Sequence, residues 1–194
     1  MMDSHKDRLL DIIFQSDLVS DAFERASRIN LPNWYIGAGC IAQTVWNYFH
    51  GYDLESFISD IDLVYFDPTD PSYEAENAVI QKAKEFFRWS PIPVDVKNQA
   101  RVHLWYEDKY GYAILPYRSI EEAIDTWPTT STAIALRPDD ATYDIYAPYG
   151  LEDLFSLTIR PNKVQITREI YEAKCRKWIK HWPKLIFLPW ENNT

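Results

Sequence analysis

The stretch SDIDLVYFD, residues 59–67, most constrains the fold of this chain, because it puts two acidic residues at the start of an otherwise apolar strand. Strand interiors avoid aspartate, and an unpaired carboxylate is costly to bury. Residues i and i+2 of a strand project from one face, so Asp60 and Asp62 point the same way, about 6.5 Å apart along the backbone. Two such carboxylates repel each other, so the pattern predicts a cation between them.

A third carboxylate follows in the next predicted strand. The segment IPVDVK, residues 92–97, has alternating character and places Asp95 between two valines. Mg²⁺ takes carboxylate oxygens together with substrate phosphates, and two ions about 3.5–4 Å apart can clamp the attacking and leaving oxygens of a phosphoryl displacement. The three aspartates therefore indicate a metal site. The residues alone also fit a turn-capping Asp60, with Asp62 and Asp95 on a solvated sheet face.

Between strand and helix, the segment YIGAGCIAQ turns through Gly37 and Gly39. Glycines let a backbone approach a phosphate, and the helix start that follows offers free N–H groups. The third glycine of a dinucleotide fingerprint and the Gly-Lys of a P-loop are both missing, so a simple tight turn is the alternative. Lys97 lies on the strand face of Asp95, where it could neutralise triphosphate oxygens or pair with that carboxylate.

Other polar residues are weaker candidates for ligand contact. The spacing of Gln43, Asn47 and His50 places them on one side of a predicted helix. This polar stripe could point toward the base or acceptor, or it could be a solvated face. Three arginines are unranked candidates for phosphate contact: Arg101, Arg118 and Arg137.

Apolar periodicity and turn residues predict a mixed α+β protein with a central sheet. The predicted helices are 6–29, 40–50, 72–88, a short one opened by the capping-box pair Ser119 and Glu122 and reaching 124, a helical turn at 150–155, and 165–182. The predicted strands are 34–37, 60–66, 92–97 and two within 132–148 joined by an Arg-Pro-Asp-Asp turn.

The charge distribution bears on partners. The net charge of −9 argues against general affinity for nucleic acid, yet residues 160–184 contain eight Lys and Arg against two Glu, a net +6. In the last predicted helix an apolar stripe predicts a core face: Tyr171, Cys175, Trp178 and Trp182. The basic side chains are expected on the opposite face: Arg168, Lys174, Lys177 and Lys180. RNA binding there is the less favoured interpretation. A basic helix that packs against, or simply balances, the acidic remainder is preferred.

Nothing in the sequence predicts export or membrane insertion. The first residues lack the pattern of a signal peptide, and no apolar run approaches the ~20 residues that span a bilayer. Cys40 and Cys175 form neither a metal-type cluster nor a disulfide framework. A reduced, cytoplasmic environment is expected.

The order of strand, glycine turn, helix, D-x-D strand and Asp strand resembles the nucleotidyltransferase superfamily that includes DNA polymerase beta. The whole chain, over roughly residues 10–190, is similar to a family of small nucleotidyltransferase-like proteins. The segments that carry this similarity are IGAGCIAQTVWNYFHG, SDIDLVYFD, PVDVKNQARVHLWY, APYGLEDLF and the RPN at 160–162.

The resemblance implies a polymerase-beta-like core, a mixed sheet flanked by helices, with a C-terminal helical and β-hairpin elaboration. One domain over 1–194 is expected, with its core at about 30–100 and the elaboration at about 101–194. By resemblance, Gly37, Ala38 and Gly39 face phosphate. Asp60 and Asp62 hold Mg²⁺ or Mn²⁺, and Asp95 shares a metal or activates the acceptor.

The implied reaction transfers a nucleoside monophosphate from a nucleoside triphosphate to an unknown hydroxyl acceptor. Two alternatives stay open: a non-catalytic relative that binds nucleotide or metal, and an RNA-binding module that uses the basic C-terminal helix.

Overall fold

A computed structural model describes residues 4–190 and has five strands in one mixed sheet. The strands are β1 (Trp34–Gly37), β2 (Ile61–Tyr65), β3 (Val94–Asn98), β4 (Ala135–Asp139) and β5 (Thr142–Tyr146). Their spatial order is β3-β2-β1-β4-β5. Only the β2–β3 pair is parallel within this sheet. The predicted α+β fold with a mixed sheet and flanking helices is confirmed.

The register of the sheet aligns the positions that the sequence singled out. Asp62 of β2 pairs with Asp95 of β3 on one side and with Gly37 of β1 on the other. Side chains of paired residues share a face of the sheet. The two aspartates therefore stand side by side next to the glycine turn that ends β1.

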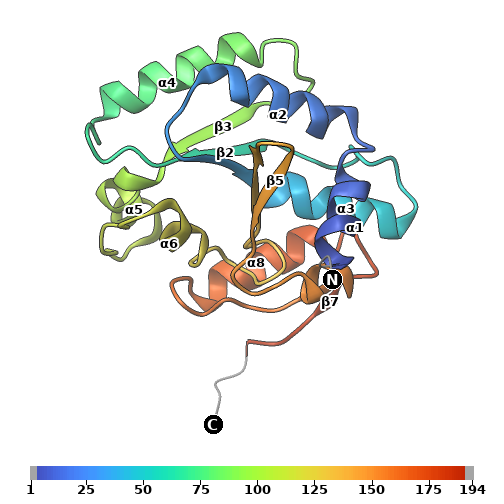
Figure 1. Cartoon of the computed structure of the whole chain (residues 1–194). Coiled ribbons are helices and arrows are strands. Elements are labelled where there is room, and N and C mark those ends of the chain that lie inside the picture. Colours follow the sequence, from blue (N-terminus) through green and yellow to red (C-terminus); the bar gives the residue numbers. More distant parts are fainter. Residues whose placement is uncertain (1–3, 191–194) are drawn as a thin grey trace.

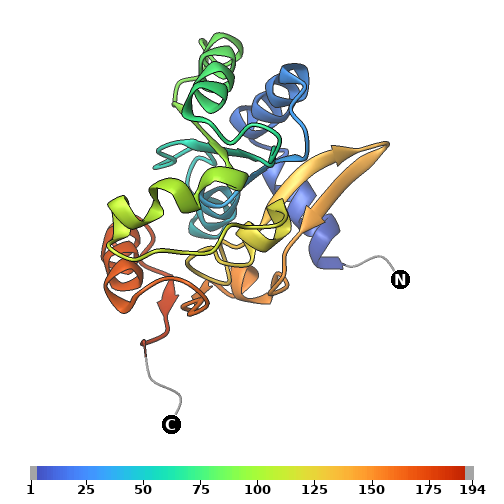
Figure 2. The same ribbon diagram turned by 90° about the vertical axis from the view of Figure 1, so that its left-hand side faces the viewer.

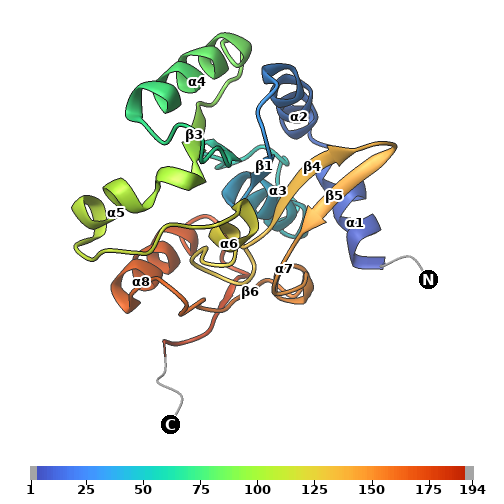
Figure 3. The same cartoon turned by 60° about the vertical axis from the view of Figure 1, so that its left-hand side comes forward.

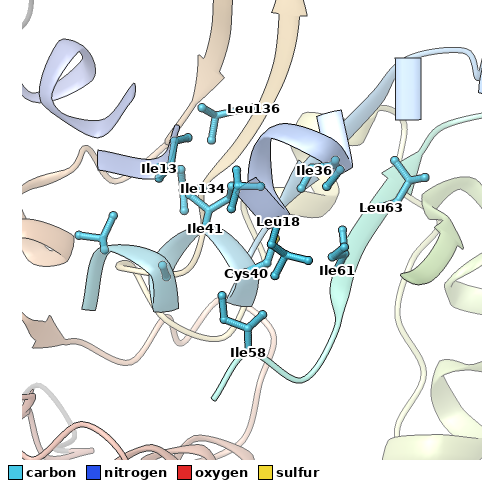
Figure 4. Packing of buried hydrophobic residues seen from close by; sticks show 14 of the residues in the cluster. Ile13, Leu18, Ile36, Cys40, Ile41, Ile58, Ile61, Leu63, Ile134 and Leu136 are labelled. Carbon is cyan, nitrogen blue, oxygen red and sulfur yellow. The ribbon is translucent and has the colours of Figure 1, made fainter. Parts of the chain in front are cut away.

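The two faces of the sheet are covered differently. On one face lie α2 (Asp17–Ile29) and α4 (Tyr73–Phe86), side by side (Figures 1 and 2). Ile36 pairs with Leu63 and with Leu136, and all three belong to the large apolar cluster drawn in Figure 4. The opposite face has a smaller cluster built on Tyr35 and Val64. That smaller cluster leaves room for a cavity.

Helices from the C-terminal half lie on the cavity side of the sheet (Figure 3). They are α5 (His103–Tyr110), α6 (Ile120–Ile124), α7 (Glu152–Phe155) and α8 (Arg168–Trp178). The short 3-10 helix η1 (Gln99–Arg101) joins β3 to α5. Strands β6 (Thr158–Ile159) and β7 (Ile186–Phe187) form a separate parallel pair, and α3 (Gly39–His50) follows β1 directly.

The single helix predicted over 6–29 is wrong: the segment forms α1 (Ser4–Ile13) and α2, with a break between them. Ser16 causes the break. It has extended backbone dihedrals, and its Oγ accepts the N–H of Val19 at 3.3 Å as the cap of α2. A serine cap satisfies one of the free N–H groups of a helix start. The apolar periodicity continues through the break, which hid it.

Two further differences concern the C-terminal half. The hairpin β4–β5, expected in the elaboration beyond residue 100, pairs through β4 with β1 and so extends the central sheet. Its turn lies at Asp140, which has a φ of +42°. Helix α5 was not predicted, because HLWYEDKY buries only Tyr106 fully and has no apolar stripe. The predicted cap of α6 is confirmed by the Ser119 Oγ, which accepts the Glu122 N–H at 3.2 Å.

Among residues 4–190, no helix is long and apolar enough to cross a bilayer. Cys40 and Cys175 are both free thiols, and Cys40 is buried.

Candidate active site

Three carboxylates converge where β2 and β3 lie in parallel. One oxygen each of Asp60, Asp62 and Asp95 lies within 4.8 Å of the others. The β2–β3 register places Asp62 beside Asp95, and Asp60, just before β2, accepts a hydrogen bond from Ser59 Oγ at 2.7 Å. The three residues that the sequence proposed as a metal site are thus gathered in one place. Carboxylate oxygens are the ligands that Mg²⁺ and Mn²⁺ prefer.

The electrostatics of Asp62 match a site for a cation. Burial, the largest cause, and the neighbouring charges of Asp60 and Asp95 raise the pKa of Asp62 to about 7. Opposing them are the N–H of Gly39, 3.4 Å from Oδ2, and the charge of Lys174. Three carboxylates this close cannot all ionise cheaply without a counter-ion. The donor set therefore fits a divalent metal ion.

The two glycines of the turn beside the triad have different roles. A Cβ on Gly37 would lie 2.4 Å from the carbonyl oxygen of Ile134, so this glycine is required for the close approach of β1 and β4. Gly37 does not line the cavity, whereas Ala38 and Gly39 do. Ala38 has a φ of +54° and a ψ of −124°, and its N–H is bonded to the Ile134 oxygen.

Helix α3 starts at Gly39 without a side-chain cap. The first N–H groups of an uncapped helix lack intrahelical acceptors and favour an anion. Gly39 already directs its N–H toward Asp62. The helix start and the carboxylate triad thus face the same space.

That space is a cavity of about 370 Å³ between the sheet and the C-terminal helices. Its volume lies in the range of small-molecule sites. The strand side contributes Ala38, Gly39, Gln43 and the three aspartates, and the helical side contributes aromatic and basic side chains: Trp105, Tyr106, Lys109, Tyr110, Tyr117, Trp127, Lys174, Lys177 and Trp178.

Lysines come to the cavity from both sides. Lys97 lines it and forms an ion pair with Asp95 on the same strand face. From α8, Lys174 lies close enough to Asp62 and Asp60 for their charges to raise its pKa, while burial, the larger effect, lowers it. Lys109 of α5 and Lys177 of α8 also line the cavity.

The weaker sequence candidates divide. Gln43 lines the cavity, and its Oε1 is buried without a hydrogen-bond partner among the described residues. Asn47 is structural: its Nδ2 donates to the carbonyls of Leu54 and Ser56, and its Oδ1 accepts the indole N–H of Trp182. His50 accepts the backbone N–H of Lys184 at 3.0 Å.

The three candidate arginines lie outside the cavity lining. Arg101 pairs with Glu76 in a buried contact, Arg118 pairs with Glu122 at the surface, and Arg137 pairs with Asp144. Their charges are already neutralised by carboxylates, so the interpretation of these arginines as phosphate contacts is dropped.

The sequence interpretation missed the helical side of the cavity. The predicted core stripe is confirmed for Tyr171, Trp178 and Trp182, which are buried, and Cys175 is half-buried. The basic side chains were expected on the opposite face, against the acidic remainder of the chain or balancing it, but not in a ligand cavity. Ile170, Lys174 and Lys177 follow the spacing i, i+4, i+7 and line the cavity together with Trp178. This adjacent stripe was present in the sequence, but nothing there said which element it would face.

Comparison with known proteins agrees with this geometry. The chain matches a protein family described as Nucleotidyltransferase over residues 24–187. The chain belongs to this nucleotidyltransferase family. A search of curated proteins gave no significant match. The family match confirms the resemblance to nucleotidyltransferases that the sequence predicted.

A solved structure has the same fold as this chain. It is an NMR structure described as a CCA-adding enzyme head domain, with a TM-score of 0.77 and 25% sequence identity. The match covers 94% of this chain and 95% of the other. Most of this chain thus has the same fold as that head domain.

Proposed function

We propose that this nucleotidyltransferase moves a nucleoside monophosphate from a nucleoside triphosphate to a hydroxyl acceptor. The observation that carries the proposal is the convergence of Asp60, Asp62 and Asp95 beside the start of α3, in one cavity. Membership of the family supports the reaction class. The metal dependence and the roles of single residues are part of the proposal.

In this proposal, Asp60, Asp62 and Asp95 hold Mg²⁺ or Mn²⁺. When bound, such ions neutralise the charge that develops on the phosphoryl oxygens. Ala38 and Gly39 present backbone to the phosphates, and Gly37 permits the turn that carries them. Lys97, on the strand face of Asp95, contacts a phosphate oxygen.

The bond changes are those of an in-line displacement. The acceptor hydroxyl oxygen forms a bond to the α-phosphorus, and the bond from that phosphorus to the α,β-bridging oxygen breaks. Pyrophosphate leaves with the electron pair, and Asp95 takes the hydroxyl proton. Asp95 can also share a metal ion, because its oxygen lies within 4.8 Å of those of Asp60 and Asp62.

The acceptor is left open in this proposal. The solved relative is described as a CCA-adding enzyme head domain, which makes an RNA end one acceptor to include in a screen. The net charge of −9 makes a small uncharged acceptor, or a side chain of another protein, the favoured classes.

The test is a calorimetric titration of each of the four nucleoside triphosphates, with and without Mg²⁺ or Mn²⁺. The Asp60→Asn, Asp62→Asn double variant is run beside the wild type. The matched control is Asp7→Asn, Asp11→Asn, which removes two charges from exposed positions of α1. We expect metal-dependent binding of at least one triphosphate in the wild type and the control, and none in the site variant.

Metal-independent binding that survives the Asp60→Asn, Asp62→Asn change would overturn the proposed role of the triad. Metal-dependent binding without transfer to any acceptor in a broad screen would favour the non-catalytic alternative.

A further inference from the structure

Three positive charges face the carboxylate triad across the cavity. Lys109 of α5 and Lys174 and Lys177 of α8 all line it. Lys174 is partly buried, and Lys109 and Lys177 are more exposed. The positive charges of Lys177 and Lys109 lie close enough to Lys174 to lower its pKa. Three like charges gathered in one cavity repel each other, so the arrangement is costly unless an anion joins them.

The charges of Asp62 and Asp60 reach Lys174 across the cavity, but no carboxylate of the described residues is in direct contact with any of the three lysines. None of the three forms an ion pair within 4.0 Å. On the same helix, by contrast, Arg168 and Arg176 both pair with Glu172. Helix α8 thus neutralises the charges that point away from the cavity and leaves those that point into it.

Aromatic rings flank two of the three ammonium groups. The Lys109 Nζ lies 5.3 Å from the ring centroids of both Trp105 and Tyr110, and the Lys174 Nζ lies 5.6 Å from that of Trp178. Contacts of this kind attract a cation without neutralising it. They restrict where the lysine heads lie and leave their charge available to a ligand.

We infer that Lys109, Lys174 and Lys177 bind the β- and γ-phosphates of the nucleotide, between α5 and α8. This inference rests on the proposed function. The aspartates and their metal would hold the α-phosphate at the strand side, and the lysines would hold the leaving pyrophosphate on the helical side. We call these three residues the lysine cluster. Lysine ammonium groups suit this task because they act as point charges toward phosphate oxygens.

The charge arrangement favours a polyphosphate over other anions. A single carboxylate ligand would satisfy at most one or two of the lysines and would be repelled by Asp60 and Asp62. A metal-bound triphosphate carries cations to the aspartates and anionic oxygens to the lysines at once. Lys97 does not replace the lysine cluster, because it stands on the strand side of the cavity, next to Asp95, and its phosphate contact lies there.

The experiment compares lysine variants of the full chain in their binding of inorganic tripolyphosphate, and of a nucleoside triphosphate against its monophosphate. The variants are Lys174→Ala and Lys177→Ala, singly and together. The control is Lys180→Ala, an exposed lysine just past α8 that does not line the cavity. Circular dichroism and thermal unfolding show that each variant is folded, and Mn²⁺ binding by electron paramagnetic resonance reports the aspartates separately.

We expect each cluster substitution to weaken tripolyphosphate and nucleoside triphosphate binding by about tenfold. Monophosphate and Mn²⁺ affinities should stay near those of the wild type, so the preference for triphosphate over monophosphate falls. Lys180→Ala should change none of these quantities.

Two results would overturn the inference. Unchanged tripolyphosphate affinity in the double lysine variant would do so, and an equal loss of monophosphate and triphosphate binding would assign the lysines a general structural role. Neither result bears on Mn²⁺ binding by the aspartates, so the proposed function would stand. Lysine-dependent tripolyphosphate binding without any nucleotide binding would instead remove the proposed function and keep the cluster as a polyphosphate site.

Discussion

The two walls of the cavity differ in how their side chains are compensated. The strand wall, defined by Asp60, Asp62, Asp95 and the turn at 37–39, concentrates negative charge and strained backbone on adjacent strands. The helical wall, formed by α5 and α8, brings aromatic rings and lysines from sequence-distant segments, and these lysines form no ion pair within residues 4–190. The strand wall is set by sheet register, which is local and rigid. The helical wall depends on how helices far along the chain pack.

This difference gives the two walls different weak points. A substitution in the strand wall should change the stability of the fold, through backbone strain or charge repulsion. A substitution in the helical wall should weaken ligand binding and change the stability of the fold little. The lysine variants test the second statement, and substitutions at or next to the strand wall test the first.

The largest effect is expected where the two walls are joined. Arg101 ends η1, between β3 and α5, donates to the carbonyl of Pro71 at 3.0 Å and pairs with the buried Glu76. Arg101→Ala leaves that carboxylate buried and unpaired, which should lower the free energy of unfolding by about 3–5 kcal/mol. Urea unfolding measures the loss.

The matched control for this change is Arg118→Ala, whose ion pair is at the surface. It should leave the free energy of unfolding nearly unchanged, because solvent screens an exposed ion pair. If Arg101→Ala were as stable as this control but bound triphosphate poorly, Arg101 would be a phosphate ligand after all, and the division into two walls would be wrong.

A substitution at Gly37 tests how closely the backbone packs in the strand wall. A Cβ at this position would lie 2.4 Å from the Ile134 oxygen and 2.8 Å from the Ala135 Cβ, so β1 and β4 would have to move apart. Gly37→Ala should destabilise the fold by about 2–3 kcal/mol. Thermal or urea unfolding provides the measurement, and Gly111→Ala, at a position with open space around it, shows the cost of a backbone effect alone. Equal losses in both variants would contradict a steric role for Gly37.

The pKa of Asp62 predicts how stability depends on pH without metal. Its folded pKa is raised to about 7, so the folded state holds a proton that the unfolded chain releases near pH 4. The stabilisation is full below pH 4 and is lost as the pH rises through 7. Between pH 5 and 8, the wild type should therefore lose about 2.5 kcal/mol relative to Asp62→Asn.

Urea unfolding of both proteins in a chelator at the two pH values checks this prediction. Adding Mn²⁺ at pH 8 should restore the wild type and leave Asp62→Asn unchanged, because only the wild type retains the full set of carboxylates. A wild type that loses no stability relative to the variant would show that the triad is already compensated by Lys97 and Lys174.

The contrast between the walls also explains what could be predicted from the sequence. Asp60, Asp62 and Asp95 were found because the strand period of two and the pairing of neighbouring strands fix their directions within a few residues. Lys174 and Lys177 were placed opposite the core stripe of α8 but not in the cavity, because a helix stripe has no direction until its neighbours are known. Helix α5 was missed for a similar reason, since tertiary packing, and not an apolar stripe, holds it.

Ala38 is expected to give the smallest effect, at the tip of the strand wall. Its φ of +54° and ψ of −124° form a conformation that a side chain disfavours. Ala38→Gly should raise the free energy of unfolding by about 1 kcal/mol, because relief of this strain outweighs the added freedom of the unfolded chain. Ala42→Gly, in the middle of α3, is the opposite control and should destabilise the fold by about 1 kcal/mol or more.

If Ala38→Gly instead destabilised the protein as Ala42→Gly does, the turn would not be strained, and the alanine would contribute packing. Nucleotide affinity separates a further possibility. The N–H of Ala38 is already bonded to Ile134, so the free N–H groups that would contact phosphate in the proposed function are those at the start of α3. A stabilised Ala38→Gly should therefore bind triphosphate as the wild type does. A gain in stability with a loss of affinity would mean that the strained turn holds the start of α3 in the position that the phosphates need.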